Sequence, residues 1–306
     1  MKLAGLSVDV DSVASHLEGY GFERPEDDGL ALSTGVRRAL KLFEQMGARA
    51  TFFLIAGEAE SQPEVVNEIV RQGHEVGSHS MTHGLPFANL SEERSQLEID
   101  ASRQLLERLA GERVVGFRAP SWDADPDLCA RLVRAGYRYD ASAYPSILLP
   151  LLRREIASRS PGGDLRTRSG LWEGVFGPTD VHRRPTAAGP IWEVPVGTTP
   201  VARLPYYHTL RYVLPDRVFR AIGAWARSRR GPVTYQFHAV DFLDTRQDAL
   251  DPRIARHPGM QADLQTKLGL AERSLSELGR AHTIVPLREL IRKIEESSAP
   301  SRTERN

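Results

Sequence analysis

The sequence predicts an α/β fold in which a parallel sheet with crossover helices closes in a barrel-like way. Short apolar runs of strand length alternate with segments whose apolar residues recur at helical spacing. The alternation continues through seven or eight strand–helix units, more than a small open sheet needs. Polar residues stand at the ends of several apolar runs, where a barrel would gather them at one rim.

The first half of the chain supplies five strands and four helices in order. The strands are predicted at residues 3–10, 50–56, 74–80, 114–120 and 137–142. The helices are predicted at residues 33–49, 63–73, 90–111 and 125–136. A glycine stands at or near the end of each helical pattern, as is common where a helix stops.

From about residue 145 to 190 the alternation breaks, and Gly, Pro, Arg and Thr become frequent without a period. This composition predicts long loops or a small hairpin, not a second domain. Strands then resume at 191–197, 232–240 and 282–286, with helices at 215–231, 259–281 and 287–297. We therefore predict one domain over 1–296 with an irregular insert at about 145–190, followed by a polar tail, 297–306.

Composition excludes several classes of protein. The 306 residues are 41% apolar and 26% charged, as in soluble globular proteins. The net charge of zero gives no bulk attraction to nucleic acid. Cys129 is the only cysteine, which excludes an internal disulfide framework and suits a reducing compartment.

Membrane association is predicted to be peripheral at most. The first residues lack a signal-peptide-like apolar segment, and no run reaches the roughly 18 apolar residues of a membrane span. These features predict a cytoplasmic protein. Residues 146–156 and 203–230 mix apolar and aromatic residues with arginines, which suits a membrane interface. Ordinary packing of amphipathic helices explains the same composition.

Charged and imidazole side chains stand at the predicted strand ends, and in a parallel fold these ends converge. Because an unpaired buried charge costs several kcal/mol, such residues need partners. The set is Asp9, Asp11, His79, His83, Arg118, Asp140 and His238.

Two carboxylates and two histidines within this set favour a metal site. Asp9 and Asp11 share one face of a strand and repel each other unless a cation or a proton lies between them. His79 and His83 with one carboxylate leave coordination positions open, as a catalytic zinc site requires. Cobalt, nickel, manganese and iron suit the same ligands. The alternatives are a solvated strand end and two structural histidines.

Three further residues could transfer a proton or hold the residues that do so. His238 could protonate a leaving group opposite a carboxylate base, or it could be structural. Arg118 could hold that base by a bidentate pair, or it could form a surface ion pair. Asp140 could orient His238, or it could be a cap or turn residue.

Four short motifs carry a resemblance to a known family. They are "HSMTH" (79–83), "RAPSW" (118–122), "YDASAY" (139–144) and "TYQFH" (234–238). With the strand "ATFFLIA" (50–56), they resemble the NodB-type polysaccharide deacetylases, carbohydrate esterase family four, over residues 3 to 290. The first motif, "VDVDS", separates two aspartates that are usually adjacent. This D-x-D form resembles a branch with some intracellular peptidoglycan deacetylases and lipid A aminoarabinose deformylases.

The resemblance implies a distorted (β/α)7-type barrel and a role for each motif residue. Asp9 would be the base and His238 the acid, with Arg118 and Asp140 tuning them. One divalent metal, zinc first, would be held by Asp11, His79 and His83. The backbone amide near Ser121 would hold the oxyanion, while Trp122 and Tyr144 would wall the pocket.

The implied activity is metal-dependent removal of an N-acetyl group from an amino sugar, as a small molecule, a glycan or a lipid-linked sugar. Tetrameric relatives in the D-x-D branch imply a homo-oligomer. The alternatives are a metal-free cyclic imidase or amidase of the same fold, a deformylase acting on a lipid-linked amino sugar, and a non-enzymatic sugar-binding module. Retention of Asp11, His79 and His83 argues against the imidase, and retention of Asp9 and His238 argues against the binding module.

Overall fold

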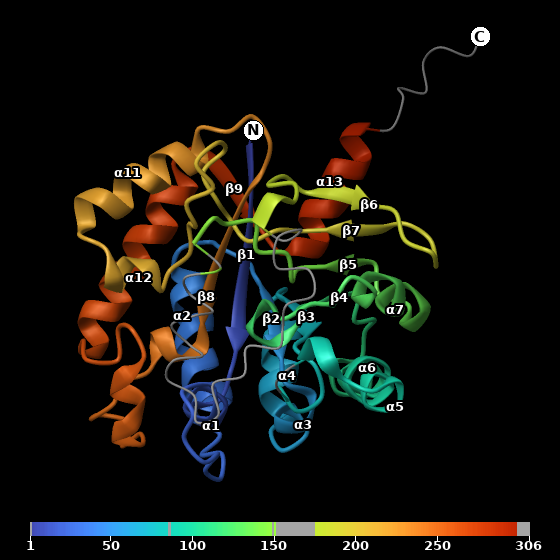
Figure 1. Cartoon of the computed structure of the whole chain (residues 1–306). Helices are drawn as coiled ribbons and strands as arrows, with labels where there is room; N and C mark the ends of the chain where they lie inside the picture. Colours follow the sequence, from blue (N-terminus) through green and yellow to red (C-terminus); the bar gives the residue numbers. More distant parts are fainter. Residues whose placement is uncertain (1, 85–86, 149, 151–174, 299–306) are drawn as a thin grey trace.

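A central strand, β1 (Lys2–Val10), runs through the middle of the molecule (Figure 1). The computed structural model describes residues 2–84, 87–148, 150 and 175–298. Seven consecutive residues of β1, Ala4 to Val10, are buried, as expected of a parallel strand covered on both faces. The strand pairs in parallel with β2 (Thr51–Leu54), β8 (Val233–His238) and β9 (His282–Val285).

The sheet has the strand order β6-β7-β5-β4-β3-β2-β1-β8, with β9 also paired to β1. All of these pairs are parallel except β6 with β7. The remaining strands are β3 (Glu75–Ser78), β4 (Gly116–Phe117), β5 (Tyr139–Asp140), β6 (His182–Arg184) and β7 (Ile191–Glu193). Each predicted strand is present, and most are shorter than their apolar runs.

The sheet curls into a half-barrel, and an irregular segment, 194–208, spans the gap between β5 and β8. The backbone N–H of Val194 donates to the Asp140 carbonyl at 2.8 Å, and that of His208 donates to the Gln236 carbonyl at 3.0 Å. Pro195 and Pro205 have no N–H to donate, so a regular ladder cannot run through this segment. The barrel-like closure that we predicted is therefore made by irregular chain, and β7 stops before Pro195.

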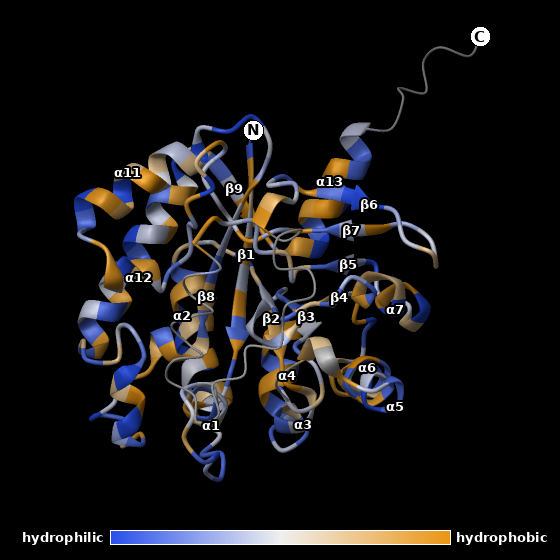
Figure 2. Ribbon diagram, in the orientation of Figure 1, coloured by the Kyte–Doolittle hydropathy of each residue, from blue (hydrophilic) through white to orange (hydrophobic). Residues whose placement is uncertain are grey.

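Helices surround the sheet, and each long one carries both hydrophobic and hydrophilic residues (Figure 2). The predicted helices are α2 (Val36–Gln45), α4 (Pro63–Arg71), α5 (Glu92–Gln96) with α6 (Ser102–Ala110), α7 (Leu128–Ala135), α11 (Asp216–Arg227), α12 (Leu264–Gly279) and α13 (Leu287–Ser298). Two π-helical segments, η1 (Ala31–Gly35) and η3 (Leu97–Ala101), precede α2 and join α5 to α6.

Several short helices were not predicted from the sequence. They are α1 (Val13–Gly19), α3 (Ala56–Ala59), α10 (Leu210–Val213) and the 3₁₀ turns η2 (Phe87–Asn89), η4 (Pro120–Trp122), η5 (Ala239–Phe242) and η6 (Pro252–Arg256). No helix in the described ranges is long and apolar enough to cross a membrane.

The interior of the half-barrel is filled with side chains. Phe53 and Tyr139 pack there with their ring centroids 6.4 Å apart. A Cβ at Gly77 would lie 2.6 Å from the Phe53 ring, and one at Gly116 would lie 2.0 Å from the Tyr139 ring. Bulky rings therefore block the interior, and the chemistry is confined to the rim at the C-terminal ends of the strands.

Two predicted segments lie partly outside the described residues. Of the predicted insert at 145–190, residues 149 and 151–174 are outside, and the described remainder includes the antiparallel β6 that extends the sheet edge. Of the predicted tail at 297–306, residues 299–306 are outside. The membrane-type segment predicted at 146–156 also lies mostly outside.

Candidate active site

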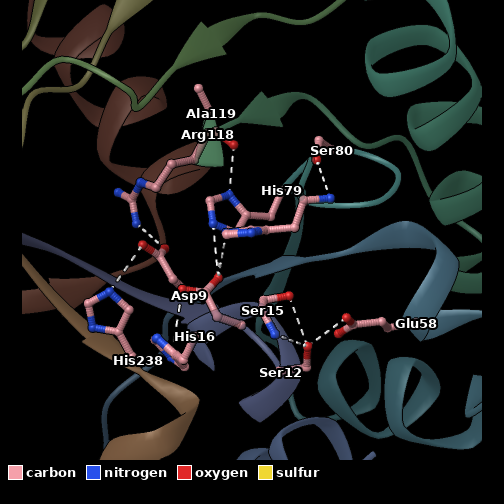
Figure 3. Close-up of polar contacts among 12 residues, drawn as sticks. Asp9, Ser12, Ser15, His16, Glu58, His79, Ser80, Arg118, Ala119 and His238 are labelled. Atoms are coloured by element: carbon pink, nitrogen blue, oxygen red, sulfur yellow. Dashed lines mark hydrogen bonds and ion pairs between the residues drawn. The ribbon is translucent and has the colours of Figure 1, made fainter. Parts of the chain in front are cut away.

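Six of the seven predicted strand-end residues converge where β1, β3, β4 and β8 end. All six are buried. They are Asp9, Asp11, His79, His83, Arg118 and His238. Figure 3 shows Asp9 between Arg118 and His238, with the His79 ring beside it. The predicted convergence of strand ends therefore places most of the candidate residues in one site.

Asp11, His79 and His83 form a compact set of potential metal ligands. One ligand atom from each lies within 4.8 Å of the others. The Nε2 atoms of His79 and His83 lie 3.0 and 3.5 Å from Asp11 Oδ1. His79 Nδ1 lies 2.7 Å from the Arg118 carbonyl, which can only accept, so the ring proton is on Nδ1. The Nε2 lone pair then faces the carboxylate, and the two acceptors repel unless a cation or a proton lies between them.

Unpartnered atoms in this set strengthen the metal interpretation. Among the described residues, Asp11 Oδ1 and both ring nitrogens of His83 are buried without a hydrogen-bond partner. Burial lowers the pKa of His83 to about 3, so its ring is neutral at physiological pH. Burial alone would raise the pKa of Asp11, but His83 and His79 outweigh it and hold that pKa well below its usual value. One carboxylate oxygen and two imidazoles are a ligand set that fits a divalent metal with open coordination positions.

A buried carboxylate shapes the loop that carries His83. Ser80 and His83 have left-handed backbones, with φ of 71° and 59°. The N–H groups of Met81 and Thr82 both donate to Glu98 Oε2 at 2.9 Å. Glu98 lies in the π-helical segment η3, a deviation often found near functional sites. We did not predict this residue, because the sequence gives no sign of the π-helical turn.

Arg118 is fixed against Asp9. Its Nη1 contacts Asp9 Oδ1 and lies 3.0 Å from the Ser7 hydroxyl. Its Nε donates to the Ala141 carbonyl at 3.0 Å, and the guanidinium lies 4.3 Å from the centroid of the Phe53 ring. The structure therefore places Arg118 on Asp9, as expected, but through one nitrogen instead of a bidentate pair.

His238 lies on the other side of Asp9, with its Nε2 3.9 Å from Asp9 Oδ2. Its Nδ1 lies 3.3 Å from the Thr209 hydroxyl. Asp140, which we expected to orient His238, does not contact it. Asp140 Oδ1 instead accepts from the Ser142 backbone N–H at 3.1 Å and the Ser142 hydroxyl at 2.5 Å. The expected pairing fails because β5 and β8 are separated by four other strands in the sheet order.

Two further histidines, not predicted, line the site. His16 Nε2 lies 4.0 Å from Asp11 Oδ2, and the His16 ring packs on His257 with centroids 4.6 Å apart. Both rings lie about 6 Å from the His238 ring, at 6.1 and 6.2 Å. Burial lowers the pKa of His16 to about 4, so it is neutral at physiological pH. His16 follows Asp11 by five residues on α1, and recognising this short helix could have revealed it.

Ser12 anchors the helix that carries His16. Its hydroxyl accepts from the Ser15 N–H at 3.1 Å as the N-cap of α1, and it donates to Glu58 at 2.7 Å (Figure 3). The cap begins α1 directly after β1, and this abrupt change of direction brings His16 back over Asp11.

An aromatic pair walls one side of the site. The rings of Trp122 and Tyr144 stack with centroids 4.9 Å apart, and Trp122 lies 6.4 Å from His238. Tyr144 is buried, so Trp122 is the more accessible of the two. Ser121 is exposed beside it, and both Ser121 and Trp122 have φ of 53°. Use of the backbone amide near Ser121 as an oxyanion donor stays a prediction.

Part of the chain is similar in sequence to known polysaccharide deacetylases. Residues 27–139 match the family model described as polysaccharide deacetylase. A peptidoglycan deacetylase of Helicobacter pylori is 35% identical over 144 residues, which cover 46% of this chain and 49% of that protein. The match therefore spans about half the length of this curated relative.

Solved structures are similar over nearly the whole chain. A Mycobacterium smegmatis protein assigned to the polysaccharide deacetylases has a TM-score of 0.63 at 15% identity, covering 99% of this chain and 93% of its own. Puue allantoinase has a TM-score of 0.59 at 16% identity, covering 97% and 91%. At these identities the likeness shows the fold alone. It confirms the predicted deacetylase-type fold, which we expected as a distorted barrel and which the structure forms as a curled half-barrel.

Proposed function

We propose that the chain is a hydrolase of the polysaccharide deacetylase family, which removes N-acetyl groups from amino sugars with the help of a metal. The observation that carries this proposal is the buried set Asp11, His79 and His83, in which Asp11 Oδ1 and both ring nitrogens of His83 have no hydrogen-bond partner. A divalent metal held by the set would supply Lewis acidity toward an amide carbonyl and toward water.

Asp9 is suited to act as the general base. Arg118 occupies its Oδ1, and this leaves Oδ2 to accept a proton. Water attacking the amide carbon would give that proton to Asp9 as the new C–O bond forms.

His238 is suited to act as the general acid. Its Nε2 lies on the Oδ2 side of Asp9, and Thr209 contacts Nδ1 and fixes the plane of the ring. When the C–N bond breaks, His238 would protonate the departing nitrogen, so that acetate and a free amine are released. Asp140 has no direct part in this scheme.

An amino-sugar glycan is the proposed substrate, supported by the peptidoglycan named for the Helicobacter pylori relative. A cytoplasmic location, a homo-oligomer and peripheral membrane contact stay proposals from the sequence. The metal-free imidase of the same fold is the rival function. It is disfavoured because, without a cation, it leaves Asp11 Oδ1 and His83 buried and unpartnered.

Elemental analysis of the purified protein, with acetate release from N-acetylglucosamine oligosaccharides, tests the proposal. We expect about one equivalent of metal, activity lost on chelation and restored by zinc or cobalt. The Asp11→Ala/His79→Ala variant should lack both metal and activity. Metal-free wild-type protein that hydrolyses cyclic imides would favour the rival.

A further inference from the structure

A groove between α11 and α12 lies on one flank of the molecule and shares no residue with the site described above (Figure 1). Two carboxylates line it, those of Glu272 and Glu277. Five guanidinium groups line it as well, and they leave an excess of three positive charges in a chain whose net charge is zero. The five residues are Arg217, Arg220, Arg227, Arg273 and Arg280.

The carboxylates next to the groove are largely engaged by an arginine beneath it. Arg211 is buried, and its Nη1 and Nη2 donate to Asp216 and to Glu277, each at 3.1 Å. Arg217 and Arg280, by contrast, form no ion pair with any described residue. The positive charge of the groove is therefore not neutralised by the protein itself.

The arginines of the groove are open to solvent. The side chain of Arg220 is 64% exposed and that of Arg273 is 55% exposed. A guanidinium group binds phosphate through two parallel hydrogen bonds. Because these groups are spread along two helices and are not enclosed, they suit several phosphates on an extended surface better than one bound ion.

Exposed apolar side chains stand beside these arginines on α11. Val218 is 39% exposed and Trp225 is 41% exposed. They are seven residues apart, which places them on the same side of the helix, whereas Phe219, Gly223 and Ala226 on the other side are buried. Tryptophan is suited to a boundary between water and an apolar layer. Arginines next to exposed apolar side chains are typical of a helix that lies in a membrane interface.

We propose that the α11–α12 groove is a docking surface for an anionic phospholipid bilayer. The arginines contact headgroup phosphates, and Val218 and Trp225 enter the boundary of the acyl chains. A nucleic acid would offer phosphates but no apolar layer for these two side chains. The proposal goes beyond the proposed function, because no residue of the groove takes part in catalysis. It narrows the membrane-type segment predicted at 203–230 to α11 and adds α12.

Co-sedimentation of the full chain with lipid vesicles tests the docking surface. We expect binding to phosphatidylcholine vesicles that contain about 30% phosphatidylglycerol, release at high salt, and no binding to phosphatidylcholine alone. Arg217→Gln/Arg280→Gln should weaken the binding about tenfold without breaking an ion pair. Arg108→Gln/Arg134→Gln is the matched control, because it removes two exposed arginines, on α6 and α7, that also lack an ion pair with the described residues. Absence of binding, or equal losses in both double variants, would overturn the docking surface.

Tryptophan fluorescence distinguishes a bilayer from other anions. Emission should shift to shorter wavelength on anionic vesicles, and Trp225→Phe should remove the shift while its melting temperature stays normal. Saturable binding of inorganic phosphate or of a short DNA duplex, without binding to vesicles, would assign the groove to another anion and overturn the proposal.

Acetate release separates this proposal from the proposed function. Release from a soluble oligosaccharide should be unchanged in Arg217→Gln/Arg280→Gln, because the groove lies away from Asp9 and His238. A protein that binds anionic vesicles but releases no acetate would refute the proposed function alone. A protein that releases acetate but does not bind the vesicles would refute the docking surface alone.

Discussion

Two regions of the rim contain buried carboxyl groups. The side chains that surround these carboxyl groups differ between the two regions. At the ends of β1 and β3, Asp11 faces the imidazoles of His79 and His83. Burial keeps the His83 ring neutral, and Asp11 Oδ1 and both His83 nitrogens have no hydrogen-bond partner. At the ends of β5 and β7, Asp140 and Glu193 lie with Arg184 and the imidazolium of His182. The first region leaves ligand atoms without partners and so suits the proposed external cation, whereas in the second region cationic side chains of the chain itself lie beside the carboxyl groups. The side chains around the carboxyl groups therefore distinguish the two regions, where the carboxyl groups alone do not.

The largest expected effect concerns metal affinity at the first region. Replacing His83 by Leu removes a ligand and should weaken metal binding by at least about 1,000-fold. The metal-free variant should be as stable as the metal-free wild type or more so, because two buried, unpartnered nitrogens disappear. Melting curves with and without zinc measure both effects, since bound metal stabilises the folded state.

Glu193→Gln is the control for the His83 variant. It removes a buried carboxylate at the second region and should leave metal content unchanged. Loss of metal in Glu193→Gln, or retention of metal in His83→Leu, would contradict the contrast between the two regions.

The second effect compares two arginine–carboxylate pairs. Arg118 and Asp9 are almost fully buried, whereas Arg184 is 35% exposed beside Glu193. Arg118→Met should lower the free energy of unfolding by about 3–5 kcal/mol, because Asp9 is left buried and unpaired. Arg184→Met should cost only about 1 kcal/mol, since solvent screens that pair. Urea denaturation measures both, and equal costs would show that burial does not distinguish the pairs.

The third effect is a pH dependence of stability from Asp140. Burial, with the charge of Glu193 nearby, raises the pKa of Asp140 to about 7, above its value in the unfolded chain. The folded state therefore holds a proton that the unfolded state has lost, and this group's contribution to stability declines as pH rises from about 4 to 7. Asp140→Asn should gain up to roughly 4 kcal/mol relative to wild type across this window. His83, with its lowered pKa, should give the opposite trend, losing stability as pH falls below about 6.5.

Denaturation curves at pH 4.5, 6 and 7.5 for wild type and Asp140→Asn check this expectation. The Ser142→Ala variant is the control, because it removes a partner of Asp140 and leaves the carboxyl group in place. A constant difference between wild type and Asp140→Asn at all three pH values would show that Asp140 does not titrate in this window.

The contrast also explains which parts of the site could be predicted from the sequence. Strand ends follow from apolar runs, and a parallel sheet gathers such ends, so Asp9, His79 and His238 were found together. Asp140 was assigned to the same centre because it also ends a strand. Its partners depend on the register with β7 and on the order of strands around the curled sheet, which local sequence does not encode.

The residues that were missed belong to irregular structure. His16 lies on a helix of seven residues, His257 follows a 3₁₀ turn, and Glu98 lies in a π-helical turn. None of these elements has a strong periodic pattern of apolar residues. Tertiary contacts hold them in place, and local sequence does not reveal those contacts. The irregular chain around Pro195 and Pro205 was equally hidden, and it spans the gap where we expected regular strands to close the barrel.

The smallest expected effect tests whether the imidazoles outside the motifs support the metal-type centre. His16 Nε2 lies 4.0 Å from Asp11 Oδ2, the carboxylate oxygen turned away from His79 and His83, so it can restrict that carboxylate without holding the metal itself. Groups in this position typically change metal affinity by about 10-fold. His16→Phe, measured by zinc competition with a chelating dye, should show a loss of that size and a normal melting temperature. A loss as large as that of His83→Leu would make His16 a ligand, and the Asp11, His79 and His83 set would then be incomplete.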